Sequence, residues 1–419
     1  MKSAWNLACL IPILRETETM SRRVGLWLIG AFGGVGTTIT LGLSCLSRKI
    51  TTDAGLTTQL PLFDGLNLPQ PDQFIIGGHD IRKTSFVESA IEFRNNSGVF
   101  QPEWIEACRS DLEAASARVR PGTKLGSGAT ISKMGTWGDE SPAQTAREAV
   151  DRIARDIDQF VADEKIDHLI VLNVSSTEPV FHTRDIHHSW AALEAALPAG
   201  GPELLPSSTL YALAAIRGGH SYVNFTPSLG AGIPALLELA DKTGSLVAGK
   251  DGKTGETMMK TVLAPMFAHR NLKVLSWVGH NIFGNRDGVV LDDPVNKASK
   301  VNTKDWVTTQ ILGYKPNTLV TIEYIPDMGD WKTAWDHIHF QGFMGTPMTL
   351  QFTWQGCDSL LAAPLAIDLA RLTDLAKQHG AKGLQNHLAV FFKSPEGVED
   401  NHFFRQWAML EAYIAGLKK

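Results

Sequence analysis

Short apolar runs separated by amphipathic segments dominate the first half of the chain. Runs rich in Val, Ile and Leu, each bounded by turn residues, predict buried strands at 24–29, 74–76, 168–174, 222–224 and 245–248. Helical spacing of apolar residues predicts helices at 39–46, 102–118, 142–163, 188–196 and 207–216. Because apolar strands alternate with helices, this half is predicted to form a doubly wound parallel sheet of the Rossmann type.

The pattern changes near residue 245. A helix is predicted at 257–268, and strands at 272–278, 318–325 and 348–354 favour a second sheet that is antiparallel or mixed. A long helix at 358–379 and a short strand at 388–392 follow. The fold class is therefore α/β, a Rossmann-like parallel sheet plus an inserted α+β domain. The expected segments are a disordered extension at 1–20, the Rossmann-like domain at 21–245, the α+β domain at 246–356 and a return to the first domain at 357–419.

A glycine-rich loop follows the first predicted strand, in the sequence VGLWLIGAFGGVGTT at 24–38. A strand, a glycine turn and a helix start, in this order, present backbone N–H groups and the positive end of a helix to a pyrophosphate. Glycines are needed because the backbone turns tightly and approaches the ligand without Cβ atoms in the way. An ordinary tight turn is the alternative. The candidate dinucleotide-binding residues are Gly30, Gly33, Gly34, Val35, Gly36, Thr37 and Thr38.

Two further strand ends carry candidate ligand contacts. Asp80 and Ile81 end the second predicted strand, where a dinucleotide site binds ribose hydroxyls. The polar insert at 51–73 places this acid about twice as far from the glycines as the usual ~20 residues, so the insert must loop out. A helix-capping role for Asp80 is the alternative. Ser176 and Thr177 follow the strand at 168–174, where open α/β sheets bind ligands.

Composition excludes several classes of partner. A net charge of −5 gives no general attraction to nucleic acid or anionic lipid, so an anionic substrate needs a local group of cations. Four scattered cysteines without disulfide spacing favour a reduced, cytoplasmic setting. The apolar stretch at 7–14 contains a proline and is too short to span a membrane.

A second loop with phosphate-binding character is GKDGKTGET at 249–257. It precedes the helix at 257–268 and so delivers N–H groups and hydroxyls at a helix start. Downstream, Lys297, Lys300 and Lys304 lie in a segment without an acid. A solvated face is the common explanation of such a run, and a local anion site is the alternative that the neighbouring loop favours.

Metal and thiol chemistry receive weaker support. His337 and His339 alternate along a predicted strand and His187 and His188 are adjacent, yet neither pair has a third ligand at a recognisable spacing. A nucleophilic Cys357 would make the chain an aldehyde dehydrogenase. Because no histidine lies near it in sequence, a buried inert cysteine is favoured.

Taken together, the motifs resemble the myo-inositol-1-phosphate synthase family, also named inositol-3-phosphate synthase, from about residue 24 to residue 393. The segments that carry the resemblance are GKDGKTGETMMK at 249–260, NIFGNRDG at 281–288, GDWK at 329–332, CDSLLAAPLAIDL at 357–369 and FFKSP at 391–395. The family's four active-site lysines match Lys300, Lys304, Lys332 and Lys393.

The resemblance implies an enzyme with tightly bound NAD that converts D-glucose 6-phosphate into 1D-myo-inositol 3-phosphate. The steps are oxidation at carbon 5, enolisation at carbon 6, intramolecular aldol closure onto carbon 1 and re-reduction. In this scheme Lys300 is the base and Asp330 orients or discharges it. Lys332 and Lys393 supply fixed positive charge.

The resemblance also assigns binding roles. The substrate phosphate is expected to contact Thr254, Gly255, Thr257, Lys260 and Lys304, while Asn281 and Asn285 orient sugar hydroxyls. Besides the glycine loop, the expected cofactor-binding residues are Asp80, Ile81, Ser176, Thr177, Asp251, Asp287, Asp330 and Asp358.

The chain departs from the family pattern in four places. Gly34 and Val35 replace an asparagine pair of the eukaryotic members, so backbone contacts to the pyrophosphate must suffice. Glu256 stands where an amide is usual, Arg286 where an asparagine is usual, and Phe225 where a glycine is usual. These positions lie at cofactor or substrate edges.

The expected assembly is a cytoplasmic homotetramer built through the sheet of the second domain, with no nucleic-acid or membrane partner. A divalent cation or ammonium is a further candidate cofactor, because some members of the family use a divalent cation. Two other interpretations stay open. One is a two-domain NAD(P)-linked dehydrogenase of a small phosphorylated or aldehyde substrate, and the other is a non-catalytic NAD-binding regulator that kept the fold.

Overall fold

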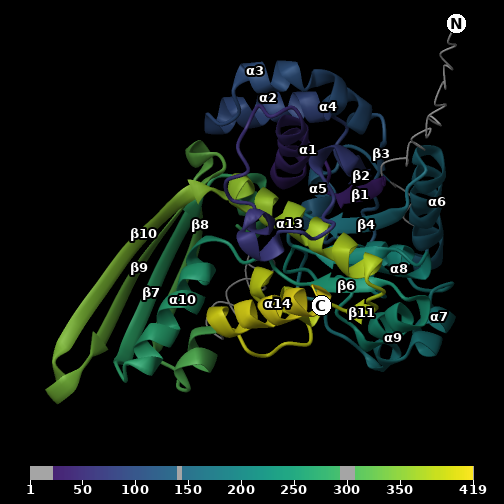
Figure 1. Cartoon of the computed structure of the whole chain (residues 1–419). Coiled ribbons are helices and arrows are strands. Elements are labelled where there is room, and N and C mark those ends of the chain that lie inside the picture. The colour runs from purple at the N-terminus through teal and green to yellow at the C-terminus, as the bar shows by residue number, and fades with distance from the viewer. Residues whose placement is uncertain (1–21, 139–143, 293–306, 419) are drawn as a thin grey trace, which may run out of the picture.

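A parallel sheet forms the larger body of the protein (Figure 1). The computed structural model describes residues 22–138, 144–292 and 307–418, so the predicted extension at 1–20 lies outside the described residues. Within these ranges seven strands pair in the order β11-β6-β5-β4-β1-β2-β3. Their bounds are β1 Val24–Ile29, β2 Phe74–Asp80, β3 Val119–Pro121, β4 His168–Asn173, β5 Ser221–Asn224, β6 Leu246–Gly249 and β11 Gly383–Leu384.

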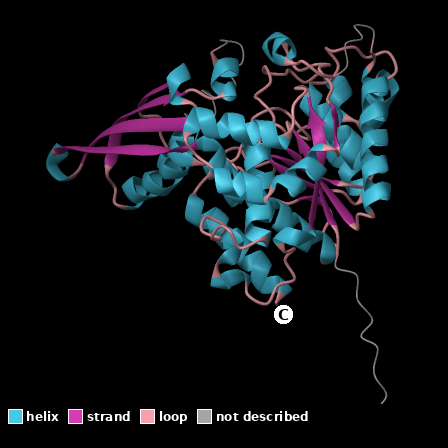
Figure 2. Ribbon diagram, turned by 90° about the horizontal axis from the view of Figure 1, so that it is seen from above, coloured by secondary structure: helices cyan, strands magenta, loops and turns pink. Residues whose placement is uncertain are grey.

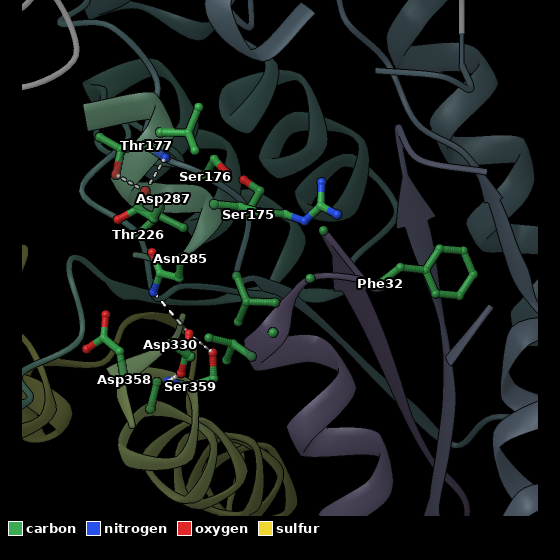
Figure 3. Close-up of a pocket in the computed structure, with 18 of the residues that line it drawn as sticks. Phe32, Ser175, Ser176, Thr177, Thr226, Asn285, Asp287, Asp330, Asp358 and Ser359 are labelled. Carbon is green, nitrogen blue, oxygen red and sulfur yellow. Dashed lines mark hydrogen bonds between the residues drawn. The ribbon is translucent and has the colours of Figure 1, made fainter. Parts of the chain in front are cut away.

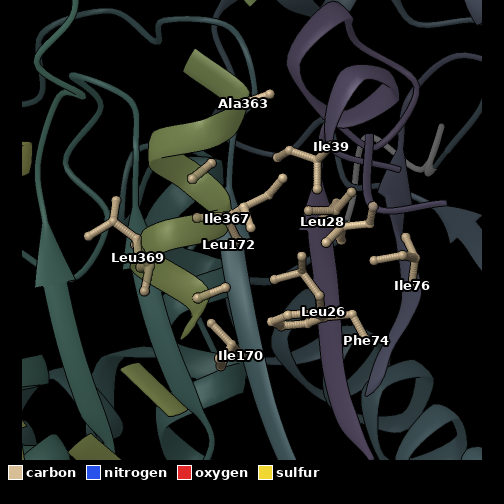
Figure 4. Close-up of a cluster of buried hydrophobic side chains, with 14 of the residues drawn as sticks. Leu26, Leu28, Ile39, Phe74, Ile76, Ile170, Leu172, Ala363, Ile367 and Leu369 are labelled. Carbon is tan, nitrogen blue, oxygen red and sulfur yellow. The ribbon is translucent and has the colours of Figure 1, made fainter. Parts of the chain in front are cut away.

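Helices cover both faces of this sheet. Leu26 and Leu28 of β1 belong to the core cluster on the side of α1 and α13 (Figure 4). Trp27 and Ile29 belong to the cluster on the side of α6 and α8. Burial on both faces explains why the strand reads as a continuous apolar run. The helices of this body are α1 Gly34–Ser47, α2 Phe86–Ser97, α3 Pro102–Ala107, α4 Arg109–Ser116, α5 Ala129–Met134, α6 Ala146–Glu164, α7 Trp190–Ala196, α8 Ser207–Arg217, α9 Pro234–Thr243, α13 Asp358–Gln378 and α14 Phe403–Leu417.

The strand order reverses at β1, which pairs with β2 on one side and β4 on the other. At such a switch point the connections diverge to opposite faces, which leaves a crevice at the carboxyl ends of the strands. The glycine loop, Asp80 and the residues after Asn173 are therefore placed around one opening.

A second, mixed sheet projects from one side of the body (Figure 2). Among the described residues it has four strands in the order β10-β9-β7-β8, and only β7 and β8 pair in parallel. Helix α10, Gly255–His269, packs Ala264 and Phe267 against Trp277 and Ile338 on one face. The remaining bounds are β7 Lys273–Phe283, α11 Arg286–Leu291, β8 Asn317–Tyr324, β9 Trp331–Gln341 and β10 Pro347–Cys357.

The predicted fold class is confirmed, and the second sheet is mixed. The strand predicted at 388–392 is wrong, since Asn386–Phe391 is a 3-10 helix and the last strand of the parallel sheet is β11. Its apolar residues are buried, and a short apolar run does not distinguish a strand from a helical turn. The helix predicted at 102–118 divides at Cys108 into α3 and α4.

No helix in the described part of the chain combines the length and the apolar character needed to cross a membrane.

Candidate active site

A cavity of about 840 Å³ lies at the carboxyl ends of the parallel strands, between this sheet and the adjoining ends of the mixed sheet (Figure 3). Its lining combines the glycine loop, the ends of β2, β4 and β5, the turns at 284–287 and 329–332, the start of α13 and Lys393. This volume falls in the range of sites that enclose small molecules, roughly 300–1,000 Å³. The fold thus brings segments from the whole chain to one opening.

The glycine loop leaves the first turn of α1 open toward the cavity. Gly33 is the N-cap of α1 and supplies no side-chain cap, so the first N–H groups are available to a ligand. Gly30 has a φ of +80°, and a Cβ there would lie 2.8 Å from the Cα of Ser175. A Cβ on Gly36 would lie 2.3 Å from the carbonyl oxygen of Ala31. The glycines are therefore required by geometry, and the cradle they form fits a pyrophosphate.

Asp80 lies beside this loop at the end of β2. Its Oδ2 accepts a hydrogen bond from the Phe32 N–H at 2.7 Å, and its Oδ1 accepts one from the Arg82 N–H at 2.7 Å. Burial raises the pKa of Asp80, although both hydrogen bonds act in the opposite direction. The carboxylate lines the cavity and also holds the glycine loop in place.

A contact between Thr177 and Asp287 joins the two sheets across the cavity. The N–H and the hydroxyl of Thr177 donate to Asp287 Oδ1 at 3.3 and 3.2 Å. Thr177 follows β4, whereas Asp287 lies in the first turn of α11 (Figure 3). The predicted residues Thr177 and Asp287 therefore meet although they lie 110 residues apart in the sequence.

Asp330 is the centre of a buried hydrogen-bond network. Its Oδ1 accepts from Asn285 Nδ2 and from the Ser359 hydroxyl, each at 3.0 Å, and its Oδ2 accepts from the Ser359 N–H at 2.6 Å (Figure 3). Burial raises the pKa of Asp330, nearby Asp358 adds to this, and the hydrogen bonds oppose it. The network fixes the turn that precedes Lys332 against the start of α13.

Two predicted lysines enter the cavity, each beside a carboxylate. Lys332 Nζ lies 3.5 Å from Asp358 Oδ1, and Lys393 Nζ lies 3.0 Å from Asp251 Oδ1. Lys332 Nζ also lies 4.9 Å from the centre of the Phe283 ring. Both acids were predicted as cofactor ligands, and the structure shows that each also holds a lysine.

The cavity collects most, but not all, of the predicted residues. Those that line it are Gly30, Gly33, Gly34, Val35, Thr37, Asp80, Ile81, Ser176, Thr177, Asp251, Thr254, Asn285, Asp287, Asp330, Lys332, Asp358 and Lys393. Those outside its lining are Gly36, Thr38, Gly255, Thr257, Lys260 and Asn281. Lys300 and Lys304 lie outside the described residues.

Lys260 is occupied by an ion pair. Its Nζ lies 2.7 Å from Glu256 Oε1, and each side chain is 2% exposed. The Thr257 hydroxyl in α10 and Asn281 Oδ1 in β7 are buried without a hydrogen-bond partner among the described residues. Both oxygens can therefore accept a hydrogen bond from a ligand.

The cavity also contains residues that the sequence did not single out. Glu178 accepts from the Ser208 N–H at 2.8 Å and from the Ser208 hydroxyl at 2.5 Å. Burial raises its pKa from 4.5 to about 7. Its position directly after Ser176 and Thr177 was a usable signal, and Ser359 lies within the segment 357–369 that carried the resemblance, whereas nothing local marked Arg82 or Glu92.

Metal and thiol sites gain no support from the geometry. The described ranges hold no group of three or more His, Cys, Asp or Glu side chains able to bind a metal ion. Cys357 is buried and its Sγ donates to Asp330 Oδ2 at 3.0 Å. Burial, together with the charge of Asp330, raises the pKa of the Cys357 thiol, which disfavours the thiolate that a nucleophile requires.

Known proteins place this site in a family. The model of the myo-inositol-1-phosphate synthase family matches residues 24–414. The chain belongs to this family. Inositol-3-phosphate synthase 1 of Bacteroides thetaiotaomicron is 33% identical, and the match covers 96% of this chain and 97% of the relative. The rice protein of the same name is 28% identical, covering 86% of this chain and 76% of its own.

Solved structures agree with this family assignment. Inositol-3-phosphate synthase of Caenorhabditis elegans superimposes with a TM-score of 0.85 at 25% identity, covering 95% of this chain and 86% of its own. A myo-inositol-1-phosphate synthase-related protein of Thermotoga maritima gives a TM-score of 0.76 at 25% identity, covering 94% and 99%. As a member of the myo-inositol-1-phosphate synthase family, the chain is an isomerase-type enzyme with NAD as its cofactor, and neither alternative interpretation is favoured.

The structure accounts for the departures from the pattern of the myo-inositol-1-phosphate synthase family. A Cβ on Gly34 would lie 2.4 Å from the Ser359 hydroxyl oxygen, so a larger residue would require this hydroxyl to move. A Cβ on Gly252 would lie 2.1 Å from the Phe225 ring, which shows how closely this ring packs on the loop. Glu256 pairs with Lys260, and Arg286 pairs with Glu92.

Proposed function

We propose that the chain converts D-glucose 6-phosphate into 1D-myo-inositol 3-phosphate. The observation that carries this proposal is that Lys332 and Lys393 share one cavity with the glycine loop. Substrate and product are isomers, so an oxidation at carbon 5 has to be reversed before the product leaves. When bound, NAD accepts a hydride from the substrate and returns it.

The proton of the carbon 5 hydroxyl needs an acceptor during oxidation. Lys300 is our proposed base, because a lysine among other cations has its pKa lowered toward neutrality. Asp330 is the proposed orienting group for this base. Asp330 is buried and accepts hydrogen bonds from Asn285 and Ser359, which supports a fixed position for its carboxylate.

Negative charge develops on the enolate and on the alkoxide formed by ring closure. Lys332 and Lys393 are proposed to stabilise these two oxygens with their ammonium groups. Asp358 and Asp251 hold the two ammonium groups at 3.5 and 3.0 Å, so little reorganisation is needed as charge forms. Asn281 and Asn285 are proposed to orient sugar hydroxyls, with Asn285 already positioned by Asp330.

The substrate phosphate is proposed to bind at the N-terminus of α10. Thr254 is the N-cap of this helix, lines the cavity and makes no side-chain capping hydrogen bond. The first-turn N–H groups, which begin at Gly255, are suited to an anion. Thr257, Lys260 and Lys304 complete the proposed site. On the cofactor side, Asp80 and Ile81 are proposed to contact ribose, together with Ser176, Thr177 and Asp287.

One assay separates this function from the alternatives. The purified chain is incubated with glucose 6-phosphate and NAD, and both periodate-resistant cyclitol phosphate and NADH absorbance are followed. We expect cyclitol phosphate without net NADH. Accumulating NADH would instead identify a dehydrogenase. Measurable NAD binding with neither cyclitol phosphate nor NADH formed would identify a regulator. Lys300→Ala with normal turnover would overturn the base assignment.

A homotetramer assembled through the mixed sheet is proposed for the same enzyme. The face of this sheet away from α10 carries Leu319 and Trp335, which are 51% and 38% exposed, and at the tip of the β9–β10 hairpin Phe343 is 89% exposed. Such an apolar surface is typical of an interface. Light scattering should report four chains per particle, and a monomer at assay concentration would contradict the proposal. The unpaired cysteines among the described residues support a reducing, cytoplasmic setting.

A further inference from the structure

Three charged side chains meet at the rim of the cofactor cavity. Arg286 Nη2 donates to Glu92 Oε1 at 2.5 Å, and Arg82 Nη1 donates to Glu92 Oε2 at 3.3 Å. All three residues line the cavity. Each oxygen of the carboxylate thus holds a different guanidinium group. We call this group the arginine–glutamate clasp, defined as Arg82, Glu92 and Arg286.

The clasp connects the two domains. Arg82 lies two residues after the end of β2 and Glu92 lies on α2, both in the parallel-sheet body, whereas Arg286 opens α11 after the mixed-sheet strand β7. Arg82 Nη2 also donates to the carbonyl of Phe32 at 2.9 Å and to the Ser89 hydroxyl at 3.1 Å. A continuous path of hydrogen bonds therefore runs from the glycine loop to the second domain.

The clasp is a set of partly exposed ion pairs. Burial raises the pKa of Glu92, but the paired arginines outweigh it and the net shift is downward, so the carboxylate stays ionised at neutral pH. The Glu92 and Arg286 side chains are 42% and 49% exposed. Ion pairs at that exposure add little to folding stability, so the arrangement is poorly explained as a structural support.

We propose that the arginine–glutamate clasp slows the exchange of NAD by tying together the two walls of its cavity. The inference rests on the proposed redox-neutral function, because an enzyme that restores its cofactor within each turnover gains from retaining it. A dehydrogenase that releases reduced cofactor after each cycle would be slowed by the same contact. Arg82, Glu92 and Arg286 are positioning residues in this proposal.

The test measures release of bound NAD directly. Full-length protein loaded with radiolabelled NAD is mixed with excess unlabelled NAD, without sugar phosphate, and the loss of bound label is followed. Glu92→Gln and Arg286→Asn each break the Glu92–Arg286 pair that joins the two walls, so each should speed release roughly fivefold. Glu106→Gln is the matched control, because Glu106 forms an exposed pair with Arg109 at 2.8 Å away from the cavity lining.

Two further measurements distinguish a clasp from a general structural effect. Raising the salt concentration should speed release from the unmodified protein but leave Glu92→Gln nearly unchanged, because salt screens exposed charges. A double variant that combines Glu92→Gln with Arg286→Asn should release NAD no faster than Glu92→Gln alone. Equal release rates in Glu92→Gln and the unmodified protein would overturn the clasp while leaving the proposed function intact. A protein that retains no NAD at all would instead remove the proposed function.

Discussion

The two sheets contribute to the same cavity in different ways. Every residue of β1 is buried, and the glycine loop that follows presents ligand contacts from one short stretch of chain. In the mixed sheet, β10 is mostly exposed, and its contribution is to set the positions of turns such as 329–332. The cofactor wall is therefore a local motif on a buried strand, whereas the reacting groups are held by contacts between distant segments. Substitutions in the two regions are therefore expected to affect NAD binding and turnover differently.

The largest expected effect is on the catalytic side. Lys332→Met or Lys393→Met should lower kcat by about 10²–10³, the size of a lost electrostatic stabiliser, without changing the NAD content. Lys382→Met serves as the control because Lys382 is an exposed lysine of the parallel-sheet body. The measurements are cyclitol phosphate formation and bound NAD per chain. Loss of NAD along with turnover would show that the two walls are not separable.

A glycine substitution tests the cofactor wall. Gly30→Ala places a Cβ 2.8 Å from the Ser175 backbone at a φ of +80°. The left-handed backbone alone costs about 1–2 kcal/mol, so NAD should bind about 5- to 30-fold more weakly. The matched control is Gly42→Ala in α1, where a Cβ meets nothing within 4 Å. It should stabilise the fold by about 0.5–1 kcal/mol in denaturant unfolding. Equal effects of both variants would refute the geometric requirement.

A buried acid beside the end of β6 predicts a pH dependence. Both carboxylate oxygens of Glu396 are buried without a partner among the described residues, although the residue as a whole is partly exposed. Burial raises its pKa from 4.5 to about 7, against an opposing effect of Lys250. The unfolded chain ionises more readily, so this contribution to stability is complete below pH 4.5 and is lost as the pH rises through 7.

Glu396→Gln should flatten this profile. We expect the decline in the free energy of unfolding between pH 5 and pH 8 to shrink by on the order of 2 kcal/mol. Glu399→Gln, at an exposed position nearby, should leave the decline unchanged. Urea unfolding at several pH values is the measurement. An unaltered slope for Glu396→Gln would mean that the acid is ionised in the folded state.

The smallest effect is expected at Cys357. Cys357→Ser keeps a donor toward Asp330 Oδ2, so turnover should stay within about twofold, the scale of one modified hydrogen bond. Cys357→Ala removes the donor and should lower stability by about 1 kcal/mol in the same unfolding assay. A complete loss of turnover in the serine variant would restore the thiol as a reacting group.

The sequence predicts the cofactor wall better than the catalytic wall, for a physical reason. Continuous apolar runs identify buried parallel strands. The glycine loop can be recognised in the sequence because its geometry excludes side chains. The pairing of Lys332 with Asp358 depends instead on the register of β9 and β10, where Lys332 lies opposite Gly356. No local pattern encodes that register. Arg82, Glu92 and Arg286 are ordinary surface charges until the fold brings them together.

Helix α13 has a consequence for how the chain is made. Its Ala363, Ile367 and Leu369 pack in the same core cluster as Leu28 and Ile39 (Figure 4). During synthesis on a ribosome, β1 and α1 emerge long before this helix, and the whole mixed sheet is made in between. One face of the parallel sheet therefore stays uncovered until the residues beyond 358, which form α13, have left the exit tunnel. This interval is when the nascent chain exposes the most apolar surface and is most in need of a chaperone.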